Sequence, residues 1–179
     1  MKNDNIKILK NLLTSKNIRE SINNNLDELL SLIPEIKHMI GFEHNHPHHH
    51  LDVWNHVLLA VEEAENNFDV RLCVLLHDIG KPFSYQDEEV RHFKNHAVVS
   101  AKMTNSILKR LGFDKKYIDK INYIVLNHDE PIILSEVNSS NKDIEIIRLK
   151  VQYADTKAHA PDKIQKRLLT LDAIAKELL

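Results

Sequence analysis

Apolar residues recur at helical spacing along most of this chain, and no segment is convincing as a β-strand. The stretch 69–79 is apolar on nearly all sides, which predicts a segment buried all round. Its length alone would also suit a buried strand, but the helical pattern elsewhere favours a helix. The pattern predicts an all-α fold with helices at residues 5–15, 17–32, 34–40, 52–66, 69–79, 95–111, 114–128, 142–159 and 162–178.

Local signals support these boundaries. Pro34 suits the first turn of a short helix, and Asp52 is a candidate N-cap for the helix that follows it. The chain has only 3 glycines and 5 prolines, and they fall mostly between the predicted helices. We expect residues 131–141 to form a loop. The length of 179 residues suits one domain with a sizeable core.

Composition narrows the class of protein. Hydrophobic residues make up 42% and charged residues 28%, an ordinary globular balance. The net charge is −2, so the basic excess of a dedicated nucleic-acid binder is missing. A single cysteine, Cys73, excludes an internal disulfide and fits a reducing compartment. The N-terminal MKNDNIKILK does not resemble a signal peptide, and no apolar run suits a membrane span. We therefore expect a soluble, cytoplasmic protein with no membrane contact.

Residues 77–82, HDIGKP, place a histidine and an aspartate side by side at the end of the apolar stretch. Burying a charge is costly unless it is paired or bound to a metal. Imidazole nitrogen and carboxylate oxygen together suit divalent ions such as Zn, Fe, Ni or Mn. A single buried histidine is more often only hydrogen-bonded, so spacing alone does not establish a metal site. Further candidates lie beside apolar positions in four other segments: His56, His96, His128 and Asp155.

The order H…HD…H…H…D, with HDIGKP at its centre, resembles the HD-domain phosphohydrolase superfamily. A closer resemblance, to the HD domain of bacterial tRNA nucleotidyltransferases, rests on LIPEIKHMIGFEHNHPHHHLDVWNHVLLAVE, HDIGKPFSY, HFKNHAVVSAKMTNSILKRLGF and IVLNHDEP. It implies one HD-type helical bundle of about 7–9 helices over residues 1–179. Its HD core would be 34–160, preceded by a helical extension at 1–33 and followed by a C-terminal helix at 161–179.

The resemblance also implies a ligand set. It gives the role of primary metal ligand to four residues: His56, His77, Asp78 and Asp155. It implies that His96 and His128 either bind a second metal, as in dinuclear members, or contact the substrate phosphate, as in mononuclear ones. Lys81 matches a residue that meets substrate or pairs with a carboxylate. The implied cofactor is one or two divalent ions, with Fe, Mn, Ni, Zn, Co and Mg all compatible with these ligand types.

The implied reaction is phosphoester hydrolysis by a metal-activated water, with catalytic roles for Asp78, Lys81, His96 and His128. The expected substrate is a nucleotide or another small phosphoester, either a phosphomonoester or a 2′,3′-cyclic phosphodiester. The alternative is a nucleotide-binding HD sensor without turnover. The tRNA enzymes carry an N-terminal nucleotidyltransferase region that nothing here resembles, so nucleotide addition is not expected. An RNA substrate is conceivable, but the near-neutral charge does not favour it, and KIQKR at 163–167 is interpreted as a solvated helix face.

Several residues near this pattern have open roles, and the oligomeric state is open as well. The segment 44–50 holds His44, His46, His48, His49 and His50, which suit the rim of the active site better than a separate metal site. His92 is expected to face substrate or to support a ligand, and His38 and His159 are expected at the surface. Ala97 stands where the relatives often have glutamate. Four residues flank the HD motif and suit either a pocket for a base or sugar or an ordinary surface loop: Phe83, Ser84, Tyr85 and Arg91.

Overall fold

The computed structural model describes residues 2–179, with side chains from residue 4, and its regular structure over that range is almost entirely helical. Nine α-helices occur among the described residues, which confirms the all-α prediction. They are α1 (Lys2–Leu13), α2 (Ile18–Asn24), α3 (Leu26–Leu32), α4 (Val53–Glu63), α5 (Phe68–Leu76), α6 (His96–Leu111), α7 (Lys115–Leu126), α8 (Lys142–Ala158) and α9 (Gln165–Leu178).

The N-terminal segment differs from the prediction of one helix at 17–32. The chain breaks at Asn25, whose side-chain Nδ2 donates 2.8 Å to the Ser21 carbonyl oxygen, so α2 and α3 are separate. Asparagine competes for backbone hydrogen bonds and is a weak helix former, and three asparagines occur here in a row. The next segment, predicted as a helix at 34–40, is the 3₁₀ helix η1 (Pro34–His38).

A two-stranded ribbon was not predicted at all. Strands β1 (Gln86–Asp87) and β2 (Arg91–His92) pair antiparallel between the 3₁₀ helix η2 (Lys81–Phe83) and α6. Each strand has two residues, too few for an alternating pattern to be visible in the sequence. Another short 3₁₀ helix, η3 (Leu134–Glu136), lies within the predicted loop 131–141.

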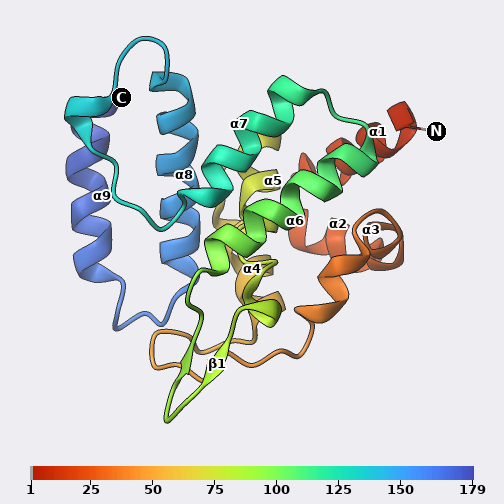
Figure 1. Ribbon diagram of the computed structural model, residues 1–179, viewed down its shortest axis with the longest axis horizontal. Coiled ribbons are helices and arrows are strands. Elements are labelled where there is room, and N and C mark those ends of the chain that lie inside the picture. Colours follow the sequence, from red (N-terminus) through yellow and green to blue (C-terminus); the bar gives the residue numbers. More distant parts are fainter. Residues whose placement is uncertain (1) are drawn as a thin grey trace.

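Helix α5 occupies the centre of the bundle, and α1, α4, α7 and α8 contact it (Figure 1). Seven consecutive residues of α5, from Val70 to Leu76, are buried, which confirms the predicted all-round burial. The pair α6–α7 crosses the face of the bundle toward the viewer in Figure 1, and α1–α3 close one side. Helix α9 lies along α8 at the opposite edge. No described helix is both long and apolar enough to cross a membrane.

Helix α5 ends at Leu76, three residues before the predicted end, and His77–Gly80 form a turn. Gly80 is required here because of packing: a Cβ at this position would lie 2.5 Å from the Ser100 backbone nitrogen and 2.8 Å from the His96 carbonyl oxygen. Glycine thus allows the first turn of α6 to lie directly against the HD turn. The close approach brings His96 to Asp78.

Helix α9 is attached through a small apolar cluster separate from the main core. Its buried members are Ile132, Leu149, Leu171 and Leu178. Leu149 belongs to α8, and the two leucines of α9 lie in the middle and the last turn of that helix. The contact between α8 and α9 is therefore apolar toward the C-terminal end of α9.

Candidate metal centre

The structure brings all six predicted ligand residues together at one end of the bundle. His56 ends the first turn of α4, and His77 and Asp78 begin the turn after α5. His96 is the first residue of α6, and Asp155 lies near the end of α8. His128 follows the last residue of α7 by two positions. Residues up to 99 positions apart in the chain thus meet in space.

One group of donors lies around Asp155. The Nε2 atom of His56 is 2.9 Å from Asp155 Oδ1 and 3.6 Å from Asp78 Oδ2. The Nε2 atom of His77 is 3.3 Å from Asp155 Oδ1 and 3.2 Å from Asp78 Oδ2. Two ligand atoms each about 2.1 Å from one ion lie about 3.0–3.4 Å apart, by the angles of octahedral and tetrahedral coordination. His56, His77 and Asp78 have donor atoms close enough to share one ion, as have His56, Asp155 and His159.

A second group lies on the other side of Asp78. Its Oδ1 atom is 3.3 Å from His96 Nε2, and His96 Nε2 is 3.2 Å from His128 Nε2. Asp78, His96 and His128 have donor atoms close enough to share an ion. The two oxygens of Asp78 thus face different groups: Oδ2 faces His56 and His77, and Oδ1 faces His96.

Each of the four histidines among the six predicted ligand residues directs its Nδ1 atom at a main-chain carbonyl oxygen. The pairs are His56 with Ala158, His77 with Val74, His96 with Phe93 and His128 with Val125, at 3.2, 2.6, 3.0 and 2.7 Å. A carbonyl can only accept, so Nδ1 carries the proton in the neutral ring and Nε2 presents a lone pair. Such outer hydrogen bonds fix the tautomer and the orientation of metal-binding histidines.

Three buried polar atoms in the centre have no well-aligned hydrogen bond among the described residues: His77 Nε2 and both carboxylate oxygens of Asp78. Unpaired polar atoms are costly to bury, and buried charges are normally paired or bound to metal. Lys81 contributes one positive charge, with Nζ 2.7 Å from Asp78 Oδ2. A divalent ion fits this donor set, because mixed nitrogen and carboxylate ligands suit such metals.

Mutual charge controls protonation in the centre. Burial alone lowers the pKa of His77, but the charges of Asp78 and Asp155 outweigh it and hold that pKa well above the usual value. Burial raises the pKa of Asp78, but His77 and Lys81 outweigh it and hold that pKa well below the usual value. The carboxylates therefore stay ionised. Their negative charge can be balanced by a proton on His77 or by a metal ion. Metal binding at His77 is then coupled to proton release.

Lys81 is held by His44, which the sequence analysis placed only at the rim of the active site. His44 is buried, donates from Nδ1 to the Leu51 carbonyl oxygen at 2.8 Å, and accepts from Lys81 Nζ at 3.1 Å through Nε2. Burial and the charge of Lys81 lower the pKa of His44 to about 2, so the ring remains neutral. Lys81 thus pairs with a carboxylate, one of the two roles that the resemblance implied for it.

Two further members of the histidine cluster, His46 and His49, line the cavity at the centre, whereas His48 and His50 are exposed. The rings of His44 and His49 stack at 3.6 Å, and His49 lies 4.9 Å from His56, centroid to centroid. Burial, followed by the charge of Lys81, lowers the pKa of His49. Every group of three metal-ligand side chains found among the described residues includes at least two of the predicted ligand residues. No separate metal group thus occurs within the cluster among the described residues, and His44, His46 and His49 lie beside the centre.

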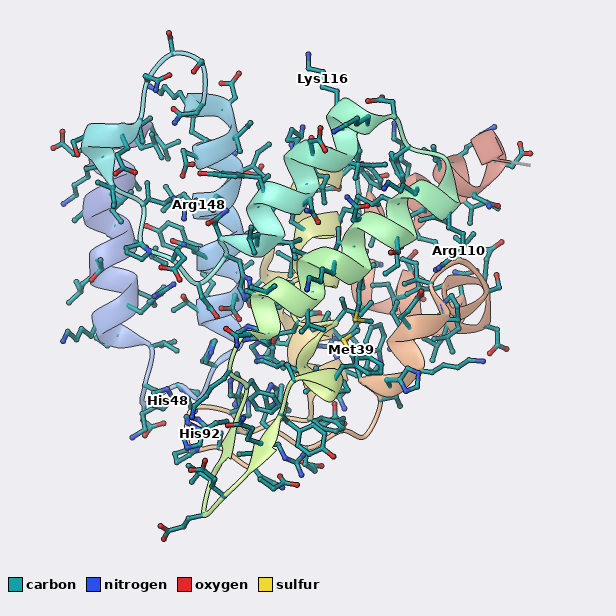
Figure 2. All side chains as sticks on the ribbon, in the orientation of Figure 1. Met39, His48, His92, Arg110, Lys116 and Arg148 are labelled. Carbon is teal, nitrogen blue, oxygen red and sulfur yellow. The ribbon has the colours of Figure 1, made fainter. Side chains whose placement is uncertain are left out.

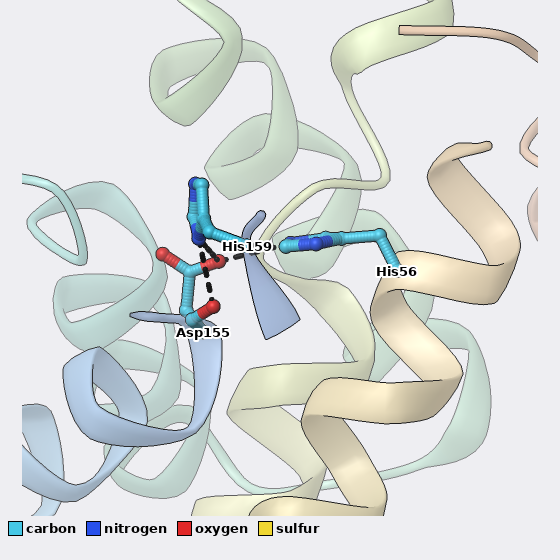
Figure 3. A group of neighbouring side chains, drawn as sticks. All are labelled: His56, Asp155 and His159. Carbon is cyan, nitrogen blue, oxygen red and sulfur yellow. Dashed lines mark hydrogen bonds and ion pairs between the residues drawn. The ribbon is translucent and has the colours of Figure 1, made fainter. Parts of the chain in front are cut away.

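His159 was predicted at the surface, and the structure corrects this. Its side chain is partly buried, with Nδ1 2.9 Å from the Asp155 carbonyl oxygen and 3.7 Å from Asp155 Oδ1. Figure 3 shows the ring standing over Asp155 beside His56, its other nitrogen on the far side. His159 directly follows α8, and side chains four positions apart lie on the same face of a helix. The spacing of four residues from Asp155 was the available signal.

Asp129 supports the second group from outside. Its Oδ2 atom is 3.2 Å from His96 Nε2 and 3.5 Å from His128 Nε2. Burial raises the pKa of Asp129, but the two histidines outweigh it and lower that pKa to about 2. Asp129 directly follows His128 in the chain, and its half-exposed carboxylate contacts the centre.

A cavity of about 230 Å³ opens onto the centre. Lys81, Arg91, His92 and His159 are among the residues that line it. Of the four residues that flank the HD motif, Arg91 lines this cavity, whereas Phe83 and Tyr85 are 51% and 43% exposed and do not. Histidines make up half of the lining, and the charges of Lys81 and Arg91 face the carboxylates of Asp78, Asp129 and Asp155 there.

A comparison with known families identifies the class. The HD domain profile matches residues 48–169, and the chain belongs to this family. HD domains form a superfamily of metal-dependent phosphohydrolases that bind divalent metals, so the donor cluster has the composition expected for the family.

Two curated relatives confirm the more particular resemblance. The CC-adding tRNA nucleotidyltransferase of Thermus thermophilus is 34% identical over 104 residues, 54% of this chain and 24% of that protein. The Multifunctional CCA protein of Hahella chejuensis is 28% identical over 93 residues, 50% of this chain and 22% of that protein. The chain thus matches less than a quarter of the length of either relative.

Proposed function

We propose that this protein is a metal-dependent phosphohydrolase that cleaves a small phosphoester. The proposed substrates are nucleotide phosphomonoesters or 2′,3′-cyclic phosphodiesters. One observation carries the proposal: the two carboxylate oxygens of Asp78 face two separate groups of imidazole donors, 3.2 Å from His77 and 3.3 Å from His96. A carboxylate in this position can bridge two ions, as in two-metal hydrolytic sites.

The residues divide into two proposed metal sites that share Asp78. The first uses His56, His77 and Asp155, and the second uses His96 and His128. Divalent metal bound there would supply a water of lowered pKa and would polarise a phosphoryl oxygen. The main-chain carbonyls behind the histidines hold the Nε2 lone pairs in place before substrate arrives.

Lys81 and Arg91 supply the positive charge that the chain itself directs at the substrate. Lys81 is buried at the wall of the cavity, where its charge is less screened than at an open surface. The Arg91 guanidinium donates 2.6 Å to Asp87 Oδ1 and lies 4.8 Å from the ring centroids of Phe42 and Tyr85, so it is held at the cavity mouth. These two cations would attract a phosphate and stabilise the negative charge that develops on it.

The nucleotide-adding activity in the names of the relatives is not part of this proposal. Each relative is matched over less than a quarter of its length, and the proposal uses only residues within the HD domain. The resemblance supports a nucleotide or the end of a nucleic acid as the class of substrate. A small molecule is favoured over RNA because the net charge is −2.

The test is turnover of a panel of 2′-, 3′- and 5′-nucleoside monophosphates, 2′,3′-cyclic nucleotides and p-nitrophenyl phosphate. Asp78→Asn keeps the shape of the side chain and removes its charge, so turnover should fall more than the roughly 10–100-fold typical of supporting residues. The matched control is Asp27→Asn, at an exposed carboxylate in α3, which should leave turnover unchanged. Full turnover in Asp78→Asn would contradict the proposal.

Metal content should be measured on untagged protein purified without a nickel column, because the histidine cluster can capture nickel. One or two equivalents of a divalent metal are expected, with loss in His77→Ala. Nucleotide binding without turnover in the metal-loaded protein would favour the sensor alternative instead.

A further inference from the structure

A second and larger cavity adjoins the metal centre. It has a volume of about 450 Å³ and lies between α8 and α9. Asp129, Asp155 and His159 line both this cavity and the smaller one at the centre. Its size lies within the roughly 300–1,000 Å³ range of small-molecule sites. A molecule held by one end at the centre can therefore extend between the two helices.

The cavity exists because the two helices are packed together at only one end. The apolar cluster that joins α9 to α8 includes Leu171 and Leu178, so the first turns of α9 lack this packing. The α9 residues that line the cavity run from Lys166 to Ile174, about 12 Å of helix at about 1.5 Å per residue. Figure 1 shows the two helices side by side at the edge of the bundle.

The chemistry of the wall changes along the cavity. Pro131, Leu171 and Ile174 provide apolar surface, and Gln152 and Thr156 of α8 provide polar groups. Such a mixed lining suits an organic body with a few polar groups, rather than a bare inorganic ion.

Two cations, Lys166 and Arg167, also line the cavity. Neither has an acidic partner within 4.0 Å among the residues whose side chains are described, whereas the neighbouring Lys163 pairs with Asp162 at 3.0 Å. The sequence suggested only a solvated face for this basic run. Both side chains are exposed, as that prediction requires, and both also line the cavity that adjoins the metal centre, where a second anion on the same ligand would reach them.

We propose that the α8–α9 cleft binds the leaving group of the substrate and that Lys166 and Arg167 bind a second phosphate on that group. This inference rests on the proposed function and names its substrate class: organic bisphosphates such as a nucleoside 3′,5′-bisphosphate. In the reaction, water forms a bond to the phosphorus at the metal centre and the bond from phosphorus to the ester oxygen breaks. The leaving oxygen takes a proton, and the products are inorganic phosphate and an alcohol that still carries its second phosphate.

Product binding tests the site independently of turnover. Adenosine 5′-monophosphate is the alcohol product expected from adenosine 3′,5′-bisphosphate, and adenosine lacks its phosphate. Calorimetric titration of the metal-loaded protein should show at least tenfold tighter binding of the monophosphate than of adenosine. Lys166→Glu/Arg167→Glu should abolish this preference, and the milder Lys166→Gln/Arg167→Gln should reduce it.

The control variant is Lys116→Glu/Lys176→Glu, which changes net charge equally at two exposed lysines outside the cavity. Figure 2 shows Lys116 at the opposite end of the molecule from His48. The control should keep the preference. Equal loss in control and test variants would overturn the inference, because the effect would then come from net charge alone. A preference that survives Lys166→Glu/Arg167→Glu but disappears in Asp78→Asn would also overturn it, since the phosphate would then sit at the metal centre.

Kinetics separate this inference from the proposed function. The wild-type KM for adenosine 3′,5′-bisphosphate should be at least tenfold below that for adenosine 3′-monophosphate, and Lys166→Glu/Arg167→Glu should remove the difference. Hydrolysis of both compounds with equal KM would refute the second phosphate site and leave the hydrolase intact. No hydrolysis of either compound, together with product binding that depends on Lys166 and Arg167, would refute the hydrolase and support the site.

Discussion

A charged side chain is buried near each end of α5, and the two side chains have different hydrogen-bond partners. At the first end, Arg71 is 4% exposed, and its Nη1 donates hydrogen bonds to the carbonyl oxygens of Leu13 and Ser15 and to Asn66 Oδ1. These bonds tie the connection between α1 and α2 to the central helix, although Arg71 Nε makes none. Neutral acceptors from the chain itself thus hold the guanidinium.

At the other end of α5, the carboxylate of Asp78 lies beside the basic side chains of His77 and Lys81. Neither of its oxygens has a well-aligned hydrogen bond among the described residues. Both ends are equally inaccessible to solvent, so burial does not distinguish them. The two ends differ in the hydrogen-bond partners that the chain supplies. At Arg71 the chain supplies acceptors, and the side chain stabilises the fold. At Asp78 it supplies no well-aligned donor among the described residues, and the carboxylate is suited to bind a metal ion.

The largest expected effect on stability comes from Arg71→Met. The substitution removes the three hydrogen bonds of Nη1 and leaves the Leu13 carbonyl without this donor, at a cost of about 3 kcal/mol. Thermal unfolding should shift down by roughly 2–4 °C for each kcal/mol. Metal content per folded molecule should not change. Lys116→Met, at an exposed lysine, is the control and should shift the midpoint little. Metal loss at unchanged stability would reverse the assignment of the two ends.

Metal addition tests the opposite end. A ligand that binds only the folded state at about 100 times its Kd stabilises it by about 2.7 kcal/mol. The midpoint of thermal unfolding should therefore rise when metal is added to chelator-treated wild-type protein. Asp78→Asn should lose most of this rise, whereas Arg71→Met should keep it. An equal rise of the unfolding midpoint in Asp78→Asn would show that the metal binds elsewhere. The histidine cluster at 44–50 would then be tested next.

Gly80→Ala should disturb the site end through packing. The added Cβ would meet the Ser100 backbone nitrogen at 2.5 Å, so α6 must move away from the HD turn, at a cost of about 1–3 kcal/mol. His96 begins α6, so turnover should fall more than stability alone explains. Gly41→Ala is the comparison, since it has a φ of +70° with nothing within 4 Å. It should lose stability only, by about 1 kcal/mol, and equal turnover losses in both variants would contradict the packing argument.

The smallest expected effect is that of Asp52→Ala. Asp52 was predicted as an N-cap, and its Oδ1 atom accepts from the Asn55 backbone nitrogen at 2.7 Å at the start of α4. Its loss should cost about 1 kcal/mol. His56, one turn further on, is held by the Ala158 carbonyl rather than by the cap, so metal affinity should stay within twofold of wild type. A large loss of affinity would show that the cap positions the ligand.

Much of the fold and the identity of the donor residues could be read from the sequence. Helical periodicity is a local signal, and it was sufficient for the all-α class and for the buried α5. It failed where propensity and packing compete, at the Asn25 break and the two-residue strands. The family resemblance carried by the order of donors around HDIGKP implied six ligand residues, and the structure brings them together.

Only the tertiary structure decided how those residues are used. The Nε2 atom of His56 faces the centre because its Nδ1 meets a carbonyl 102 positions away, and His44 meets Lys81 across 37 positions. Periodicity reports which face of an element is buried. It cannot report which partner a buried polar atom meets, because that depends on the packing of elements distant in the chain.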